Sequence, residues 1–472
     1  MKFLSAGLGA LVALGCFAQA TAAPLHRYTV TVGNGLERLE IGACFDGPAP
    51  ALLAADDTAV LHLESMRLRG EGQLALKGWE AALSGVPDDA CVDYVVQLNP
   101  ETTGAQTGGP ETRRVGRDLL TAIGDWLWRP VDSAQDDIDK SDIEVRFELP
   151  PGVSVSAPWE RVGGNTYRVG ATPREWPGVV ALGGFEPIEL STPGARLELV
   201  LIDNPQPALR DALTRWIERA ARAITTVYGV FPVPNLQVIV TPTPRGNKPV
   251  PWAYVARGGG SAVHLFVRPN FPEGEFMRDW TVVHEMSHLF LPYMQWGDAW
   301  LVEGLPTYYQ NVAMARGGLI PEEEAWRRMI RGFEDGEAVG ARYTVYQASE
   351  RIGRRGIYRR VYWGGAAYIL AVDLHLRQSS GGSYSLDDVL QEMHRCCLGT
   401  NYRWHGEDVV ARLDEAVRSR VFAETFEEQI KSRPFPDYRD SFDALGIGIL
   451  GGHPIFEDTG AAQYRRDIMS PR

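Results

Sequence analysis

The sequence predicts an α+β protein of several domains, in which an N-terminal antiparallel β-sandwich-like domain precedes a domain of mixed α/β and then helical structure. Three observations support this prediction. Up to about residue 200, short apolar runs, many with period two, stand between turn residues, as is typical of strands. Beyond residue 204, apolar residues recur at three and four positions, as they do in amphipathic helices. The chain has 472 residues, which is more than one hydrophobic core usually organises.

The composition is that of an ordinary globular protein. Hydrophobic residues make up 44% of the chain and charged residues 23%. The formal net charge of −13 argues against nucleic acid as a partner, because phosphates favour a surplus of Lys and Arg. The chain contains 9 histidines, too few for a metal-storage tract, so any metal site must be small and local.

Residues 1–22 are predicted to be a secretory signal peptide. Lys2 supplies the positive end, the apolar run 3–17 is too short for a membrane span, and Ala20–Ala22 fits an A-x-A cleavage pattern. Lipidation at Cys16 is the less favoured alternative, because the residues before it match a lipoprotein signal poorly. The mature chain is therefore expected to be periplasmic or secreted and to have no membrane span.

Four cysteines remain after signal cleavage, and four cysteines allow three pairings. Cys44 and Cys91 both lie in the β-rich region, and a disulfide between them is the preferred prediction for an oxidising compartment. Cys396 and Cys397 are adjacent and either form a vicinal disulfide or stay thiols, of which two thiols is the simpler interpretation. None of the four belongs to a C-x-x-C motif, and none is predicted to bind zinc.

The β-rich domain is predicted to cover residues 23–202. Its clearest strands are the runs 28–32, 92–98, 143–149 and 196–202. Two polar segments interrupt them. Residues 100–112 have no apolar period and are expected to form a loop. Residues 132–142 are acidic, and a solvated loop is preferred over a calcium site because the glycine and terminal glutamate of an EF-hand are missing.

The pattern changes near Asn204. Apolar residues at helical spacing predict a helix over about 209–227, and the runs 236–241 and 262–267 are predicted to be strands. A Pro/Gly-rich connection ending in Gly258–Gly260 separates these two strands. The rest of the chain is expected to be mainly helical.

A His-Glu-x-x-His motif is the strongest candidate for chemistry. His284 and His288 lie on a predicted helix, where positions four apart share a face at roughly 5–6 Å between Cβ atoms. Two imidazoles can therefore converge on one zinc ion. Glu285 is rotated by roughly 100° from His284, so it is poorly placed as a ligand but can reach a metal-bound water. The alternative is a chance motif in a core helix.

Glu303 is the predicted third ligand. It stands 15 positions after His288, at the start of a second predicted helix that Gly317 and Gly318 end. Two histidines, one glutamate and an open fourth position are typical of a catalytic zinc site. The alternative interpretation of Glu303 is a charge favoured by the helix dipole.

These motifs resemble those of the gluzincin zinc metallopeptidases, the group that includes thermolysin and aminopeptidase N. The run Trp300–Gly304 (WLVEG) follows the His-Glu-x-x-His motif, and Asp298 also matches the aminopeptidase N pattern. The gap between His288 and Glu303 is shorter than is usual in that group. The resemblance implies a thermolysin-like zinc peptidase catalytic domain over residues 203–455, with a C-terminal tail over 456–472.

The next segment resembles most closely the glycyl aminopeptidase family. Tyr362 opens a Tyr-x-x-Gly motif, and similar family motifs are met at Asp373–Arg377 and Ser385–Asp388. There are two departures from that family. The chain shows no C-terminal PDZ-like segment, and no Gly-x-Met-Glu-Asn-type motif lies near 258–264 to hold the free amine of a substrate.

Together these features predict an exported zinc metallopeptidase that binds one Zn²⁺ and cleaves peptide or protein substrates, with aminopeptidase action as one option. Glu285 would act as the general base. The resemblance gives Tyr362 the role of oxyanion donor, and Tyr358 is a nearby substitute. The alternative function is a secreted peptide-binding protein with a peptidase-like domain of weak or no activity. The oligomeric state is left open.

The surroundings of the motif carry further expectations. The resemblance implies that the strand 261–267 is an edge strand that pairs with the substrate backbone. Gly258–Gly260 either let a substrate approach or form a flexible turn. Thr307 is expected to be an ordinary helix residue rather than a support of the ligands. An arginine-rich run is interpreted as a solvated face or structural ion pairs rather than a site for a substrate carboxylate; its members are Arg351, Arg354, Arg355, Arg359 and Arg360.

Overall fold

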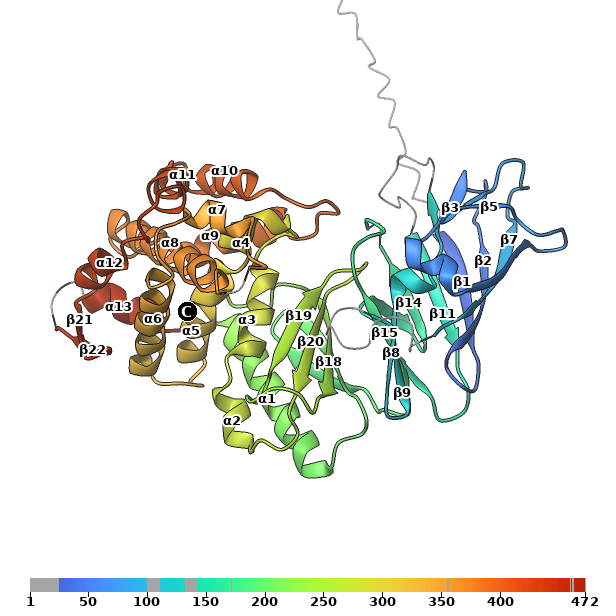
Figure 1. Cartoon of the computed structure of the whole chain (residues 1–472), viewed down its shortest axis with the longest axis horizontal. Coiled ribbons are helices and arrows are strands. Elements are labelled where there is room, and N and C mark those ends of the chain that lie inside the picture. The colour runs from blue at the N-terminus through green and yellow to red at the C-terminus, as the bar shows by residue number, and fades with distance from the viewer. Residues whose placement is uncertain are drawn as a thin grey trace, which may run out of the picture.

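The computed structural model describes residues 25–99, 111–131, 142–170, 172–354, 356–458, 460 and 462–471. The predicted signal peptide with Cys16 lies outside these residues, as do most of the two polar segments. Strands fill the N-terminal part, a mixed sheet lies in the middle, and helices form the C-terminal part (Figure 1). No helix in the described ranges is long and apolar enough to cross a membrane.

A seven-stranded sheet forms the largest part of the N-terminal region, in the order β13-β14-β11-β1-β2-β7-β4. Buried and exposed side chains alternate along its strands, as the period-two pattern predicts. The strands are β1 (Leu25–Val32), β2 (Arg38–Cys44), β4 (Leu63–Leu68), β7 (Cys91–Gln97), β11 (Asp142–Glu148), β13 (Glu160–Gly163) and β14 (Thr166–Val169). Three of these, β1, β7 and β11, match the predicted runs 28–32, 92–98 and 143–149 to within three residues.

Two four-stranded sheets accompany the large sheet, in the orders β10-β3-β6-β5 and β12-β15-β9-β8. One apolar core that includes Trp126, Trp128 and Trp159 joins the three sheets. The strands are β3 (Leu52–Ala54), β5 (Leu76–Lys77), β6 (Glu80–Ala82), β8 (Arg113–Val115), β9 (Asp118–Ala122), β10 (Arg129–Val131), β12 (Ser154–Ser156) and β15 (Val179–Gly183), with the short 3₁₀ turns η1 (Asp57–Leu61) and η2 (Ile123–Asp125).

The N-terminal region departs from the predicted antiparallel pattern at one pair. Strands β1 and β11 run parallel, whereas the other pairs of the large sheet are antiparallel. A parallel pair requires a long crossover, and the chain between β1 and β11 supplies one by passing through the other sheets. Local alternation cannot reveal this, because it is the same in both kinds of pair.

Two disulfides link cysteines within the described ranges. Cys44 and Cys91 occupy paired positions on β2 and β7 and form the predicted bridge. Cys396 and Cys397 are also bridged, where the chain leaves helix α9 (Leu386–Cys396). The simpler interpretation of this second pair as two thiols is therefore wrong.

A five-stranded mixed sheet lies between the N-terminal region and the helices, in the order β16-β17-β18-β20-β19. Its strands are β16 (Ile188–Thr192), β17 (Ala195–Leu201), β18 (Asn235–Pro242), β19 (Trp252–Ala256) and β20 (Ala262–Val267). Two of its strands precede residue 203, so the change in sequence pattern at that point falls within a continuous sheet.

The expectation that the strand 261–267 is an edge strand is wrong. Strand β20 lies between β18, to which it is parallel, and β19, to which it is antiparallel. The edge strand on this side of the sheet is β19. The sequence pattern does not predict β19, because it is short and lies within a Pro/Gly-rich connection.

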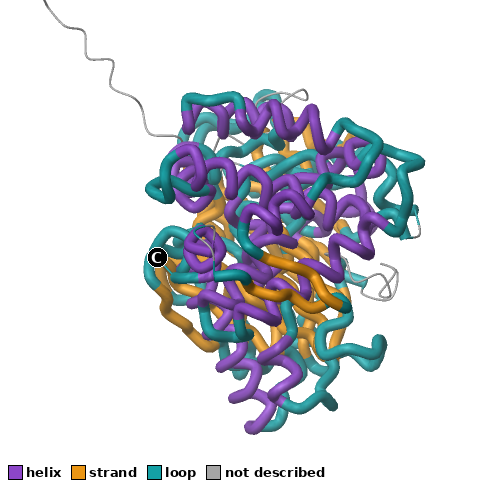
Figure 2. The backbone as a smooth tube through the Cα atoms, turned by 90° about the vertical axis from the view of Figure 1, so that its left-hand side faces the viewer, coloured by secondary structure: helices purple, strands orange, loops and turns teal. Residues whose placement is uncertain are grey.

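The two faces of this sheet pack against different partners. Val238 of β18 faces a core shared with Trp216 of helix α1 (Pro207–Thr225) and Met286 of helix α3 (Thr281–Ser287). The next residue, Ile239, packs in a separate cluster with Leu120 and other residues of the N-terminal region. Viewed from the helical end, most strands accordingly lie behind the helices (Figure 2).

The three glycines at 258–260 pack directly against the N-terminal region. The indole Nε1 of Trp159 donates a hydrogen bond to the Gly258 carbonyl oxygen at 2.9 Å. A Cβ atom on Gly260 would lie 1.9 Å from the carbonyl oxygen of Pro158. The close packing of this connection against the N-terminal region therefore requires these glycines. Neither interpretation from the sequence, substrate approach or a flexible turn, included this packing role.

The C-terminal part is helical except for a hairpin of β21 (Ile447–Leu450) and β22 (His453–Phe456). Its helices and turns are α2 (Glu273–Arg278), η3 (His288–Phe290), η4 (Trp296–Asp298), α4 (Ala299–Val302), α5 (Gly304–Arg316), α6 (Glu322–Glu337), α7 (Val345–Ser349), α8 (Tyr358–Ser379), α9, α10 (Gly406–Val417), α11 (Val421–Thr425), η5 (Phe426–Ile430), α12 (Tyr438–Ala444) and α13 (Ala462–Met469). The predicted tail thus contains a helix, and the Ile468 carbonyl accepts a hydrogen bond from Arg316 at 2.8 Å.

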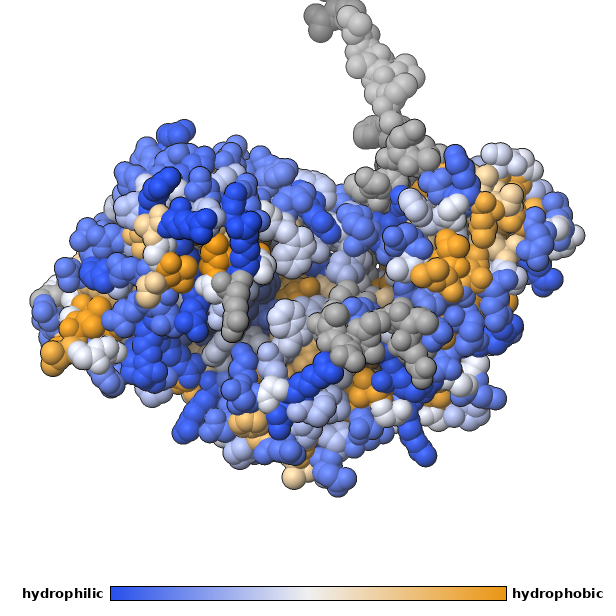
Figure 3. Space-filling model, viewed as in Figure 1, coloured by the Kyte–Doolittle hydropathy of each residue, from blue (hydrophilic) through white to orange (hydrophobic). Residues whose placement is uncertain are grey.

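The surface is mostly hydrophilic in one view, with apolar patches near both ends of the molecule and a hollow between the β-rich and helical parts (Figure 3). At the helical end, the hairpin β21–β22 contributes exposed apolar side chains, including Leu450.

A buried polar network fixes helix α5 against α8 and α9. The hydroxyl of Tyr308 donates to Asp373, and that of Tyr309 donates to Asp387, each at 2.8 Å. Arg316 donates to the same Asp387 at 2.9 Å. The residues that resemble the glycyl aminopeptidase motifs therefore hold the helix that follows Glu303.

Candidate metal centre

Helix α3 carries the His-Glu-x-x-His motif in its last turns. Val282, Val283 and Met286 bury its apolar stripe in the core, and His284 and Glu285 are buried with them. The backbone tightens into the 3₁₀ turn η3 at His288. Pro292 follows this turn, and a proline cannot continue a helix.

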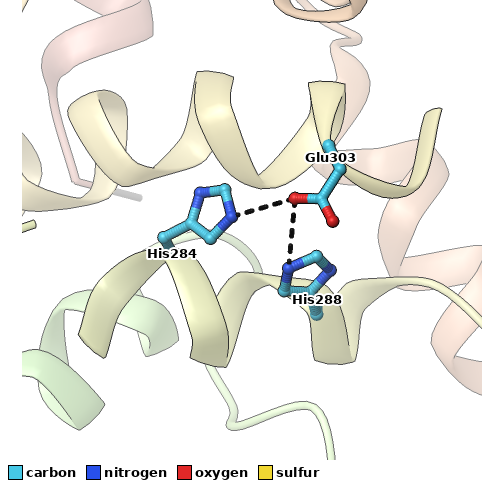
Figure 4. A group of neighbouring side chains, drawn as sticks. All are labelled: His284, His288 and Glu303. Carbon is cyan, nitrogen blue, oxygen red and sulfur yellow. Dashed lines mark hydrogen bonds and ion pairs between the residues drawn. The ribbon is translucent and has the colours of Figure 1, made fainter. Parts of the chain in front are cut away.

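Glu303 lies between α4 and α5, opposite the two histidines (Figure 4). Its Oε2 atom is 3.2 Å from Nε2 of His284 and 3.7 Å from Nε2 of His288. One ligand atom from each of the three residues lies within 4.8 Å of the others. Two imidazole nitrogens and one carboxylate oxygen that converge in this way are the donor set that zinc uses when a fourth position stays open.

The shorter gap between His288 and Glu303 does not separate the ligands. The loop that connects His288 to Glu303 is held in place by the segment around Trp404, which is distant in sequence. Trp404 pairs with it through two backbone hydrogen bonds, from its own N–H to Tyr293 at 2.8 Å and from Gln295 to its carbonyl at 3.0 Å. The Gly406 N–H donates to the Asp298 carboxylate at 2.8 Å. Asp298, which matches the aminopeptidase N pattern, therefore fixes the start of α4.

Gln310 orients His284, a contact that the sequence does not predict. Its Oε1 atom accepts a hydrogen bond from Nδ1–H of His284 at 2.8 Å, which leaves Nε2 directed at Glu303. A partner on the far nitrogen fixes the tautomer of a metal-binding histidine. Gln310 lies two turns after Glu303 on α5, so its position could have been tested from helical spacing. Among the described residues, the Thr307 hydroxyl has no hydrogen-bond partner, which agrees with an ordinary helix role.

The two carboxylates of the site have different protonation behaviour. Burial raises the pKa of Glu285 to about 7, and the negative charge of Glu303 adds to this effect. Burial also acts on Glu303, but His288 and His284 hold the pKa of Glu303 below its usual value. Glu285 therefore gains a proton more readily than an ordinary glutamate, whereas Glu303 stays ionised. Carboxylate pairs with such different pKa values are typical of acid–base sites.

Tyr362 faces this group, and Tyr358 does not. The ring of Tyr362 stacks on His284 with 6.0 Å between centroids and 3° between planes, and its hydroxyl interacts with Glu303. Burial raises the pKa of Tyr362, so the hydroxyl keeps its proton. Tyr358 is 46% exposed, and its hydroxyl accepts a hydrogen bond from Arg359.

A close crossing of two helices brings Tyr362 to Glu303. A Cβ atom on Gly365 would lie 1.9 Å from the Trp300 carbonyl oxygen, and one on Gly304 would lie 2.5 Å from the Cα atom of Gly365. Only glycine permits this approach of α8 to the start of α5. The Tyr-x-x-Gly spacing then places Tyr362 one helical turn from the crossing.

Replacing Gly365 by alanine should therefore separate the two helices. We expect a loss of about 1–3 kcal/mol of stability from overpacking and a lower rate of any reaction at the site, because Tyr362 moves with α8. Thermal unfolding and activity measured together test this. Gly274→Ala is the matched control, because a Cβ atom at Gly274 on the exposed helix α2 meets nothing within 4 Å. Equal behaviour of the two variants would contradict the role of the crossing.

Arg257 also borders the site without being predicted. It follows the edge strand β19, and its Nη2 atom donates to the carbonyl oxygens of His288 at 2.8 Å and Leu291 at 2.9 Å. Burial lowers the pKa of Arg257 to about 10. Arg257 thus adds a side-chain donor to two carbonyls at the end of the histidine helix, where helical hydrogen bonds run out. The contact joins residues 31 positions apart, so no local motif marks it.

The arginine-rich run agrees with its preferred interpretation at Arg351 but not at Arg360. Arg360 is buried and donates to the carbonyls of Tyr343 and Arg433. Arg351 pairs with Glu350 at 2.9 Å. Arg355 lies outside the described residues.

Comparisons with known proteins identify relatives of the fold. No family model and no curated protein sequence matches the chain. Among solved structures, an aminopeptidase N family protein from Idiomarina loihiensis superposes with a TM-score of 0.65 at 13% identity, over 89% of this chain and 78% of that one. An M1 zinc metallopeptidase from Deinococcus radiodurans superposes with a TM-score of 0.55 at 15% identity, over 88% and 96%.

Other structures that match are of M1 zinc metallopeptidase mutants. One, from Deinococcus radiodurans, is bound to a Tyr-Ser-Ala substrate, with a TM-score of 0.54 at 15% identity over 88% of this chain and 96% of that one. A two-domain form bound to L-arginine has a TM-score of 0.57 at 14% identity, with the same coverage. The described residues therefore have the mixed, multidomain α/β fold of the M1 zinc metallopeptidases.

Proposed function

We propose that this protein is an exported zinc metallopeptidase in which His284, His288 and Glu303 hold one Zn²⁺. The observation that carries the proposal is the convergence of two imidazole nitrogens and one glutamate oxygen beside the buried Glu285. Zinc, when bound, polarises the scissile carbonyl and lowers the pKa of a water molecule. The fold of the solved M1 zinc metallopeptidases supports the same reaction class.

Glu285 acts as general base and then as general acid. It takes a proton from the attacking water and delivers it to the leaving amine. Tyr362 donates a hydrogen bond from its protonated hydroxyl to the oxyanion that develops on the scissile carbonyl.

The edge strand β19 is the proposed binding site for the substrate backbone. It packs beside α3 and has one side without a partner strand, so an extended peptide can pair with it. The loop after β19 carries Arg257 and three glycines rather than a glutamate. We therefore propose that a free N-terminal amine is not required and that internal peptide bonds are cleaved.

The proposal also includes export of the chain and the limits of its domains. Cleavage after Ala22 would release a chain with a β-rich domain over residues 23–202, a catalytic domain over 203–455 and the segment 456–472. The disulfides Cys44–Cys91 and Cys396–Cys397 are consistent with an oxidising compartment.

Metal analysis and peptide cleavage test the function. The purified protein should contain one zinc per chain and should cleave members of a peptide library. Each peptide is supplied with a free and with an acetylated N-terminus, and we expect similar rates for the two forms. Cleavage restricted to the free form would overturn the endopeptidase proposal and favour aminopeptidase action. Binding without cleavage would instead indicate the peptide-binding alternative.

Replacing Gln310 by leucine should weaken metal binding without removing a ligand. Loss of the hydrogen bond to His284 Nδ1 frees the imidazole to rotate and to change tautomer. Changes of this kind lower metal affinity by about 10–100-fold. A zinc titration against a competing chelator measures this affinity. Gln347→Leu is the control, because Gln347 belongs to the capping box of α7 rather than to the site. An unchanged affinity in Gln310→Leu would contradict the role of Gln310.

A further inference from the structure

Two arginines converge on one tyrosine beside the metal centre. The guanidinium carbon of Arg257 lies 5.7 Å from the ring centroid of Tyr293, and that of Arg403 lies 5.0 Å from the same centroid. The two positive charges are therefore no further apart than these two distances together. They come from segments far apart in the sequence, so the pair exists only in the folded chain.

Neither arginine has an acidic partner. Of the ion pairs formed by the described residues, none involves Arg257 or Arg403. The Nη2 protons of Arg257 go to two carbonyl oxygens, and the Nε atom of Arg403 is buried without a hydrogen-bond partner. Elsewhere in the core, by contrast, Arg316 has Asp387 at 2.9 Å.

Uncompensated positive charge in a partly buried place is unfavourable unless an anion joins it. Here two such charges flank one aromatic ring, and Trp176 closes another side of that ring, edge-on at 4.6 Å. A guanidinium can present a planar pair of donors that matches a carboxylate. Because the Nη2 protons of Arg257 are taken, Arg403 is the member of the pair that can present such donors, and Arg257 adds its positive charge. A carboxylate is thus the group that this place is suited to bind.

The place lies close to the reacting groups. Arg257 donates to the backbone carbonyl of His288, and Tyr293 belongs to the loop between His288 and Glu303. Arg403 is held there because its neighbour Trp404 pairs with that loop. The end of the edge strand β19, at Ala256, directly precedes Arg257, so a peptide on β19 passes the pair.

We propose that Arg257 and Arg403 form a subsite for a substrate carboxylate next to the scissile bond, so that the enzyme prefers peptides with an acidic group at that point. The subsite rests on the proposed peptidase function and names its substrate class. The carboxylate is supplied by an Asp or Glu side chain or by the C-terminus of a short peptide. The same two charges disfavour a substrate ammonium there.

Paired peptides test the subsite in the zinc-loaded full chain. Peptides that differ only by Glu or Gln on either side of the cleaved bond, each with a free or an amidated C-terminus, are compared by kcat/KM. We expect the acidic member to be favoured about tenfold or more, mainly through KM, since hydrogen bonds to charged groups are the strong ones. The side-chain and C-terminal arms identify which carboxylate is bound.

Variants at Arg403 give the second measurement. Arg403→Gln should reduce the preference for the acidic peptide about tenfold, and Arg403→Lys should restore part of it. Arg342→Gln is the matched control, because Arg342 lies 5.3 Å from the ring of Tyr343 and should leave the preference unchanged. Zinc content and thermal unfolding report whether each variant is folded.

The outcomes separate the subsite from the proposed function. If zinc-loaded wild type cleaves acidic and neutral peptides equally, or Arg403→Gln keeps the full preference, the subsite is wrong and the peptidase stands. If no peptide is cleaved, the function fails, and binding of the paired peptides to Glu285→Gln still tests the subsite. Equal affinity for the acidic and neutral members would overturn it.

Discussion

Glu285→Gln should lower kcat by about two to four orders of magnitude, the range that a positioned general base contributes, while leaving zinc content unchanged. The amide keeps the size and much of the hydrogen-bonding capacity of the carboxylate but cannot accept the proton of the attacking water. Glu285 is not one of the three converging ligands, and its Oε2 atom lies 4.0 Å from His288 Nε2. Metal binding and proton transfer are therefore separable at this residue.

The measurement is single-turnover cleavage of a library peptide together with metal analysis. The peptide should still bind to Glu285→Gln, because β19 and the arginine pair are unaffected. Glu324→Gln is the control, since Glu324 is a helix-surface glutamate that pairs with Arg328. Full hydrolysis by Glu285→Gln would rule out the proposed mechanism. Loss of zinc in this variant would instead place Glu285 among the ligands.

His288→Ala should remove both the zinc and the activity. With one nitrogen donor gone, His284 and Glu303 remain, and two protein ligands are fewer than catalytic zinc sites use. Glu303→Ala should have the same effect, and it also leaves the two imidazoles without their carboxylate neighbour. Treatment of the wild type with a chelator should abolish activity, and added zinc should restore it.

A variant of a histidine outside the group, His264→Gln, is the control for His288→Ala. His264 is also buried, and it stacks on Tyr254 at 4.5 Å rather than meeting a carboxylate. Burial lowers the pKa of His264 to about 3, and His264 is not a member of the group of converging ligands. His264→Gln should retain zinc. A His288→Ala variant that still binds one zinc per chain, with unchanged affinity, would show that the three-residue group is not the metal site.

The local pattern was sufficient for many of the elements and for the group of His284, His288 and Glu303. Alternation predicted β1, β7, β11 and β17 to within a few residues, because each strand buries one face in a core. Helical spacing placed His284 and His288 on one face, and the spacing to Glu303 supplied the third member. These features depend on neighbours in sequence, which is why they can be read without coordinates.

The tertiary structure decided everything that depends on contacts between distant segments. The parallel pairing of β1 with β11, the edge position of β19 and the role of Gly258–Gly260 follow from how regions pack. The position of Tyr362 beside His284 and Glu303 depends on the crossing of α8 with α5, which local helical spacing cannot show.

The sequence by itself determined which residues are able to bind a metal and move a proton, since residue type and helical spacing fix that chemistry. Only the tertiary structure determined what surrounds them. Gln310, Arg257 and Arg403 reach the site from α5, from the end of β19 and from the segment before α10. Their partners lie 26 or more positions away, and no periodicity or spacing in a chain specifies a contact over that distance.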